Sequence, residues 1–187
     1  MIRRTTTSGV DILIRQEKAE EHEEVNQIIY TAFTASYGID TGTFMLNHFK
    51  EERKKNTFVP ELSLVALLEN GKIAGQITLH KTDIITESGR NTQLVLSQSA
   101  VLPEYRMCGT MRELVTYALN KAKKMGYKAV FLGGNPALYG RFGFEPSYKY
   151  GIYHEDRSKR GDEGFLVCKL VRDALHNITG TTSYYGG

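Results

Sequence analysis

The chain has 187 residues, 41% of them hydrophobic, and its 24 basic and 21 acidic residues give a formal net charge of +3. This composition predicts one soluble domain with a real core, excludes a disordered chain and gives no indication of nucleic-acid binding. No stretch approaches the roughly 20 apolar residues of a membrane helix, and segment 1–9 lacks a signal-peptide core, so we expect a cytoplasmic protein with no membrane partner. Cys108 and Cys168 lie far apart and predict neither a disulfide framework nor a metal site.

The first half of the chain predicts a mixture of strands and helices. Alternating or continuous apolar residues indicate strands, and apolar residues spaced by three and four indicate helices. Pro60 is expected to end the helical region, and Asn70-Gly71 is the strongest short signal for a hairpin. The expected order is a strand, two helices and two hairpin strands, over 10–15, 18–33, 43–55, 62–68 and 73–80.

The second half of the chain alternates strands with helices. The expected strands and helices cover 92–102, 109–125, 128–132, 138–142 and 164–170. The strand–helix–strand segment from 94 to 132 predicts a right-handed parallel crossover. The whole order predicts an α/β fold with one mixed sheet covered by helices, as a single domain over 1–187. Residues from about 145 to 187 are expected to form a C-terminal extension that completes this sheet.

The stretch after the long strand 92–102 carries the first chemical signal. A short turn follows this strand, and a helix begins near Gly109. The free N–H groups and the positive dipole end of a helix start bind anions, and a glycine lets phosphate oxygens approach the backbone. Arg106 and Arg112 can add positive charge. A pyrophosphate therefore fits this stretch, although a glycine easing an ordinary turn is the simpler interpretation of this stretch alone.

A second motif follows the next strand. Tyr139-Gly140-Arg141-Phe142-Gly143-Phe144 lies a helix and a strand after Arg106 and Gly109. In this order and spacing, the chain resembles the GNAT superfamily of N-acetyltransferases. The resemblance covers most of the chain, and the tail from Phe165 through Tyr185 resembles the closing strand of one bacterial branch. It implies the GNAT acyl-CoA N-acyltransferase fold, in which a splayed strand pair, here ending near Leu102 and Leu132, binds the cofactor.

The resemblance also implies an activity and residue roles. The donor would be acetyl-CoA, and the acceptor a primary amine of a small molecule or peptide. Backbone groups near Val101 would pair with the pantetheine arm and stabilise negative charge on the thioester oxygen. Tyr139 matches the tyrosine that protonates the departing thiolate; the alternative is an aromatic packed beside Phe142 and Phe144. The implied cofactor-binding residues are Val101, Arg106, Met107, Cys108, Gly109, Thr110, Met111 and Arg112.

The chain departs from the family pattern in the phosphate-binding turn. Met111 stands where the family usually has Gly or Ala, and Met107 and Cys108 replace a common Gly-Lys pair. The Met111 side chain either crowds the pyrophosphate or points into the core.

The usual catalytic base is also missing, because strand 92–102 contains no Asp, Glu or His. Ser99, with Ser97 and Gln98, could order a water that removes the amine proton. Glu104 and His80 are weaker candidates. These departures leave open a second function, a GNAT-like module that binds CoA with little or no catalysis. The acceptor and a homodimeric state stay open, and the residues considered for lining an acceptor cleft are Tyr37, Phe44, Glu51 and Glu52.

Overall fold

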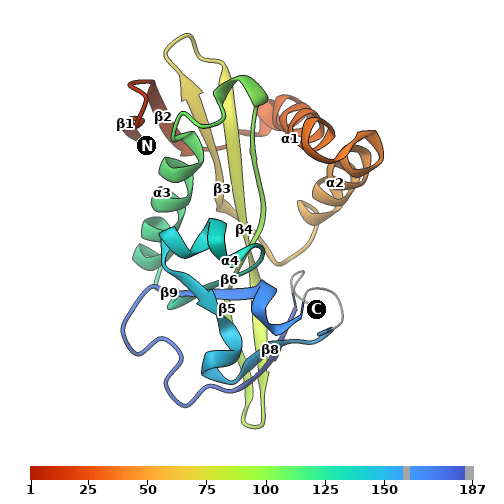
Figure 1. Cartoon of the computed structure of the whole chain (residues 1–187), viewed down its shortest axis with the longest axis vertical. Helices are drawn as coiled ribbons and strands as arrows, with labels where there is room; N and C mark the ends of the chain where they lie inside the picture. The colour runs from red at the N-terminus through yellow and green to blue at the C-terminus, as the bar shows by residue number, and fades with distance from the viewer. Residues whose placement is uncertain (158–160, 184–187) are drawn as a thin grey trace. The chain divides into compact units, whose positions relative to one another are not determined.

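The computed structural model describes residues 1–157 and 161–183. It divides into two compact units, one formed by 1–78 and 98–118, the other by 79–97 with the chain from 119 onward. Short 3-10 turns connect several elements. The strands and helices (Figure 1) are β1 (Ile2–Thr5), β2 (Asp11–Gln16), α1 (His22–Tyr37), α2 (Ile39–Glu52), β3 (Phe58–Leu68), β4 (Ile73–Thr86), β5 (Gly89–Val101), α3 (Thr110–Lys124), β6 (Ala129–Gly133), α4 (Pro136–Tyr139), β7 (Phe144–Pro146), β8 (Ile152–His154), β9 (Phe165–Lys169) and β10 (Gly180–Thr182).

The sheet of the first unit begins at its N-terminal edge strand. β1 pairs antiparallel with β2, β2 pairs antiparallel with β3, and the strand order continues to β4 and β5. The predicted hairpin at Asn70-Gly71 is confirmed. Leu68 donates its backbone N–H to the Lys72 carbonyl at 2.9 Å, Lys72 donates to the Asn70 side chain, and Gly71 has φ 84°.

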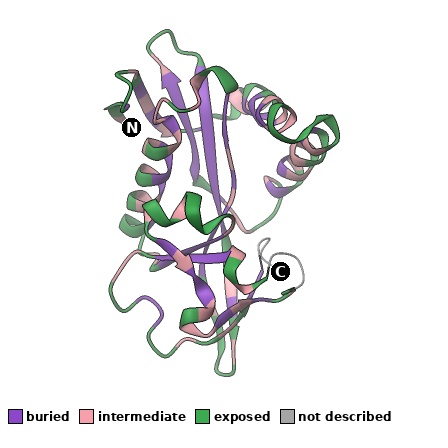
Figure 2. Ribbon diagram, in the orientation of Figure 1, coloured by how far each residue is buried: buried purple, intermediate pink, exposed green. Residues whose placement is uncertain are grey.

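Helices α1 and α2 lie side by side in the first unit and cover one face of its strands (Figure 1). Gly75 of β4 faces Leu114 of α3, because a Cβ at Gly75 would stand 3.4 Å from a Leu114 methyl carbon. The strands between the helices are buried along much of their length (Figure 2). The buried apolar cluster beneath α1 and α2 contains Val25, Ile28, Ile29, Ala32, Phe49, Val65, Leu67, Ile73, Ala100 and Leu102.

The second unit contains the predicted parallel strand pair. β5 pairs parallel with β6 through Leu94–Val130 and Val95–Phe131, and β9 lies antiparallel between β6 and β7. β8 and β10 pair parallel, and β10 also pairs antiparallel with β4. The right-handed crossover and the splay of this pair stay predictions. The core of this unit contains Ile84, Val95, Ala129, Phe131, Ile152, Phe165, Val167, Ala174 and Leu175.

The structure confirms a mixed α/β fold and corrects several boundaries. The helix expected over 18–33 begins later, at His22 of α1. The helix expected over 43–55 begins earlier, at Ile39 of α2. Pro60 lies inside β3 instead of closing the region before it. β1, β7, β8 and β10 were not expected. No helix in the described part of the chain is long and apolar enough to cross a membrane.

The domain prediction remains open. The single domain over 1–187 stays a prediction, as does the extension from about 145 onward. Within that extension, residues 158–160 and 184–187 lie outside the described residues, and they include the end of the predicted tail at Tyr185.

Candidate cofactor site and catalytic residues

The turn between β5 and α3 has the backbone geometry of an anion site. Met107 and Gly109 both adopt left-handed conformations, with φ 59° and 90°. Left-handed residues in a turn can aim successive N–H groups into one concavity that binds anions. Glu113 donates to the Gly109 carbonyl at 3.1 Å as the helix begins, so the N–H groups of residues 110–112 have no acceptor within α3. These groups suit an anionic ligand such as a pyrophosphate.

The two arginines of this turn behave differently. Arg106 is half-buried and donates to two carbonyls, that of Ala32 at 2.7 Å and that of Val101 at 3.3 Å. Its guanidinium therefore holds the turn against α1 and the end of β5. Arg112 is exposed on α3 and forms no ion pair with any described residue. Of the two cations expected to add charge, Arg112 is the one that extends into solvent.

Gly109 packs against the turn between β1 and β2. A Cβ at Gly109 would stand 2.7 Å from the Thr7 hydroxyl oxygen, and Ser8 donates to the Cys108 carbonyl at 3.0 Å. The expectation that phosphate oxygens approach the backbone at this glycine stays a prediction. The side on which a Cβ would stand is occupied by Thr7, so the positive φ and this close contact are what require glycine here.

The other predicted cofactor residues differ in exposure. Met107 is 98% exposed, and Thr110 and Val101 are buried. Cys108 is half-buried and donates its thiol to the Arg106 carbonyl at 3.3 Å. Met111 is half-buried on the first turn of α3, which leaves both interpretations of its side chain open.

Tyr139 lies at the end of α4 in the second unit. The Asn135 side chain begins this helix by accepting the Ala137 N–H at 2.9 Å. The Tyr139 ring meets Phe144 edge-on at 5.9 Å between centroids and lies 6.5 Å from Phe142. Its hydroxyl makes no hydrogen bond to any residue that the structure describes. The ring is thus packed as the alternative interpretation expected, while the hydroxyl remains available.

The candidate bases differ in exposure and in their partners. Glu104 is exposed and lies 3.0 Å from the Lys72 ammonium. Its own backbone N–H and then Lys72 hold the pKa of Glu104 below its usual value, as expected for a solvated loop carboxylate. Ser99 is half-buried, and His80 is buried in β4.

A buried polar chain runs across the first unit and was not expected from the sequence. Arg53 pairs with Glu17, Glu17 accepts from Ser63, and Thr78 lies 3.3 Å from Ser63 and donates to Gln76 at 3.1 Å. In the sequence, this buried chain could have been indicated by the polar residues at inward-facing positions of strands that are otherwise apolar. Their pairing across residues 17 to 78 is not visible in sequence spacing.

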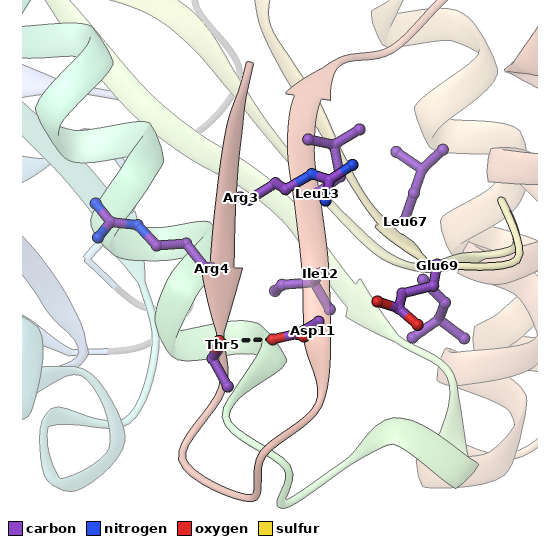
Figure 3. Close-up of a pocket in the computed structure, with 9 residues that line it drawn as sticks. Arg3, Arg4, Thr5, Asp11, Ile12, Leu13, Leu67 and Glu69 are labelled. Atoms are coloured by element: carbon purple, nitrogen blue, oxygen red, sulfur yellow. Dashed lines mark hydrogen bonds between the residues drawn. The ribbon is translucent and has the colours of Figure 1, made fainter.

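A surface pocket of about 470 Å³ lies elsewhere in the first unit (Figure 3). Thr5 donates to Asp11 at 2.6 Å at its margin, and Arg4 reaches Glu113 of α3 at 3.7 Å. It contains none of the predicted cofactor residues, and their place on the β5–α3 turn stays a prediction. The pocket is lined by Arg3, Arg4, Thr5, Asp11, Ile12, Leu13, Leu67, Leu68 and Glu69.

The residues considered for the acceptor cleft separate into two groups. Tyr37 and Phe44 are 70% and 61% exposed, and Glu51 pairs with Lys54 at the surface. The Glu52 side chain is buried and lies 3.2 Å from His48.

The chain is a mixed α/β protein in which a turn with two left-handed residues joins a strand to a helix N-terminus. Proteins that hold phosphate-bearing ligands at a helix N-terminus share this arrangement. The family model of the acetyltransferase (GNAT) domain matches residues 13–147. The chain is 35% identical over 127 residues to the uncharacterized N-acetyltransferase YhbS of Escherichia coli K12, covering 66% of this chain and 72% of YhbS. The chain therefore belongs to the GNAT family of N-acetyltransferases.

Solved structures agree with this assignment. A crystal structure of YhbS from Escherichia coli in complex with CoA has a TM-score of 0.81 and 25% identity, over 97% of this chain and 93% of that one. A GNAT acetyltransferase from Brucella melitensis in complex with acetyl-CoA has a TM-score of 0.69 and 21% identity, over 92% and 95%. The second similarity concerns the fold alone.

Proposed function

We propose that this protein transfers the acetyl group of acetyl-CoA directly to a primary amine. The observation that carries the proposal is the β5–α3 turn, in which two left-handed residues precede three N–H groups without helical partners. Family membership and the CoA-containing relatives support a CoA-based ligand. The net charge of +3 also suits an anionic ligand.

The residues of the turn would divide the work of binding. The N–H groups of residues 107–112 would donate hydrogen bonds to the pyrophosphate oxygens, and exposed Arg112 would neutralise part of the charge. Arg106 would act indirectly by holding the turn in place through its bonds to Ala32 and Val101. The backbone N–H near Val101 would stabilise negative charge that develops on the acetyl carbonyl oxygen.

Tyr139 would act as the acid toward the departing thiolate. A phenol with a pKa near 10 can protonate or hydrogen-bond a thiolate whose conjugate acid has a pKa of about 8.5. Its hydroxyl, which has no hydrogen-bond partner among the described residues, and its place in the Tyr139–Phe144 motif support this role. With no carboxylate in β5, a water held near Ser99 would take the amine proton.

Calorimetry tests the phosphate assignment. CoA and pantetheine, which lacks the phosphates, are titrated into the protein under identical conditions. We expect CoA to bind more tightly, because pantetheine makes no contact with the turn. Equal affinities would contradict a pyrophosphate site on residues 106–112.

Thiol release from acetyl-CoA with a panel of primary amines tests catalysis. Tyr139→Phe keeps the ring against Phe142 and Phe144 but removes the hydroxyl, so turnover should fall about 10²- to 10⁴-fold with little change in CoA affinity. The matched control is Tyr148→Phe, which removes a hydroxyl bound to Glu163 and should leave turnover unchanged. Full turnover in Tyr139→Phe would remove Tyr139 from the mechanism.

The same assay decides the second candidate function, a CoA-binding module with little catalysis. Met111 in place of the family glycine and the missing strand carboxylate favour it. CoA binding without thiol release across a broad amine panel would establish that function instead.

A further inference from the structure

Two buried side-chain amides of the first unit each have one group without a partner among the described residues. Gln76 of β4 and Gln98 of β5 are both only 1% exposed. Within residues 1–157 and 161–183, the Gln76 NH₂ group and the Gln98 carbonyl oxygen have no hydrogen-bond partner, although both are buried. A buried polar group without a partner is unfavourable because it has lost its hydration, so two of them on adjacent strands indicate a place where a ligand or water completes the bonding.

Both amides lie on the face that α1 and α2 cover. The Gln98 NH₂ group donates to the Met45 carbonyl of α2 at 3.3 Å. The Gln76 oxygen accepts from Thr78, which belongs to the polar chain that ends at Arg53, and Arg53 lies over the Phe49 ring of α2. Because these contacts use one end of each amide, the other end is available to a ligand. Gln98 offers a carbonyl oxygen as an acceptor, and Gln76 offers an N–H group as a donor.

The two strands bring these groups close together. Leu102 donates its backbone N–H to the Ala74 carbonyl at 3.0 Å, which aligns the end of β5 with the start of β4. Antiparallel pairing continued from this bond puts Gln76 opposite Ala100, two residues further along, and Thr78 opposite Gln98, four residues further along. Gln76 and Gln98 are therefore diagonal neighbours, with Cβ atoms somewhat less than about 7–8 Å apart, a gap suited to a small polar group.

The buried carboxyl groups on this face already have side-chain partners. Glu17 is paired with Arg53, and Glu52 lies 3.2 Å from His48. An ammonium ion brought to Gln98 would therefore lose its hydration without meeting a carboxylate that lacks a partner. A neutral amine would lose much less hydration free energy than an ammonium ion, and it can donate an N–H to the Gln98 oxygen.

We propose that Gln98 and Gln76 bind the acceptor, and that the acceptor is an α-amino amide such as a peptide N-terminus. Its neutral amine donates to the Gln98 oxygen, and its neighbouring carbonyl accepts from the Gln76 NH₂ group. This inference rests on the proposed acetyl transfer and adds the substrate class. Because both amide groups are buried, entry of the acceptor requires α2 to move and open the 3.3 Å bond between Gln98 and Met45.

The amine pKa supports the same class. An α-amino group has a pKa of about 7.7–8.0 and a lysine side chain about 10.4. At pH 7 roughly a tenth of the α-amine is neutral, against less than a thousandth of the lysine amine. A site without a free carboxylate therefore discriminates between them. Turnover of the α-amine should rise up to about pH 8 and then level off, whereas turnover of a lysine amine should continue to rise toward pH 10.

The test compares acetylation of alaninamide with that of Nα-acetyl-lysine amide at pH 7. We expect the wild type to prefer alaninamide at least tenfold in kcat/KM. Gln98→Met, of similar size but without the amide, should lower kcat/KM for alaninamide about 3- to 10-fold, mainly through KM, without changing CoA affinity. Gln98→Glu should shift preference toward the lysine amine. The matched control is Gln27→Met at an exposed position of α1, where the amide donates to the Thr31 hydroxyl.

Several outcomes would overturn this inference. One is a wild-type preference for the lysine amine; another is a Gln98→Met variant that behaves like Gln27→Met. A higher melting temperature in Gln98→Met with unchanged alaninamide kinetics would mean that the amides hold only an ordered water. If no amine is acetylated although CoA binds, the proposed catalysis fails. In that case, calorimetric titration of alaninamide into CoA-saturated protein tests the acceptor site by itself. Binding that Gln98→Met weakens would support the site, and no binding would refute it.

Discussion

Arg53 anchors the buried polar chain of the first unit, and we expect its removal to be strongly destabilising. Its side chain is 9% exposed and pairs with Glu17, whose side chain is 2% exposed. Burial lowers the pKa of Arg53, and the Glu17 charge opposes that shift. Arg53→Met leaves the Glu17 carboxylate buried without its cation, which typically costs about 3–5 kcal/mol of unfolding free energy. Urea unfolding followed by circular dichroism measures this loss.

The control for Arg53 is an exposed ion pair on the same segment. Lys54 and Glu51 are 69% and 66% exposed, and such pairs contribute about 0–1 kcal/mol. Lys54→Met should therefore leave the unfolding midpoint nearly unchanged. Equal losses for the Arg53 and Lys54 variants would show that burial of the Glu17 pair does not govern stability.

The two cysteines should react differently, because burial raises the pKa of Cys168 to about 11, and Glu145 adds to the shift. At pH 8 the folded protein then holds only about a thousandth of Cys168 as thiolate. We expect iodoacetamide to label half-buried Cys108 in the native state and Cys168 only after unfolding in guanidinium. Mass spectrometry counts the adducts. Native labelling of a Cys108→Ser variant at pH 8 would contradict the buried, protonated state of Cys168.

The same shift predicts how stability depends on pH. Because the folded pKa lies above the unfolded value of about 8.5, folding favours the protonated thiol. This contribution is fully present below about pH 8.5 and is lost as the pH rises toward 11. The Cys168→Ala variant has no thiol to ionise. Its free energy of unfolding should therefore fall less than that of the wild type as the pH rises from about 8.5 toward 11.

At the scale of elements, the pairing of β10 with β4 requires a glycine at position 180, because the backbone of β4 lies directly against it. A Cβ at Gly180 would stand 2.0 Å from the Ile85 carbonyl oxygen of β4, and backbone cannot rotate away as a side chain does. β10 also pairs with β8 through Gly180–Ile152. Gly180→Ala should therefore undock β10, cost about 1–3 kcal/mol and increase hydrogen exchange in β8 and β10. Gly140→Ala, where a Cβ meets nothing within 4 Å, should leave exchange unchanged.

Elements with local signals were predicted from the sequence, and elements held by distant partners were not. The Asn70-Gly71 hairpin and the helix after Gly109 follow from turn chemistry and apolar spacing within a few residues. β10 is only three residues of Gly and Thr, and its pairing with Ile85 is decided by tertiary contact. The start of β3 was predicted wrongly because Pro60 lies inside this strand. Pro60 precedes the part of β3 that pairs with β2, so its missing N–H breaks no hydrogen bond to β2.

The candidate site shows the same division. The turn over 106–112 and its free N–H groups could be predicted, because a strand–glycine–helix order implies them. The bonds of Arg106 to Ala32 and the contact of Gly109 with Thr7 could not, because they join segments about 70 to 100 residues apart. The sequence also named Gln98 as a residue that could order a water, but its unpaired oxygen emerges only from the packing of α2.

At the scale of the whole molecule, CoA should raise the unfolding temperature because it binds the folded state. At a ligand concentration of about 100 Kd the gain is about 2.7 kcal/mol, which corresponds to roughly 5–10 °C for a chain of this length. Arg112 is the exposed cation of the turn and forms no ion pair with a described residue, so Arg112→Ala should not change the melting temperature without ligand. The variant should weaken CoA binding about tenfold or more, because a charge-assisted contact to phosphate is lost, and should reduce the ligand-induced shift accordingly.

Arg3→Ala is the matched control, because it removes the same charge from the exposed surface but at the 470 Å³ pocket (Figure 3). Both variants lower the net charge from +3 to +2, so a general loss of attraction for an anionic ligand would affect them equally. We expect Arg3→Ala to keep the full CoA-induced shift. A reduced shift in Arg3→Ala with a normal shift in Arg112→Ala would move the phosphate site from the β5–α3 turn to that pocket. Equal, salt-sensitive reductions in both would indicate binding through net charge rather than through a built site.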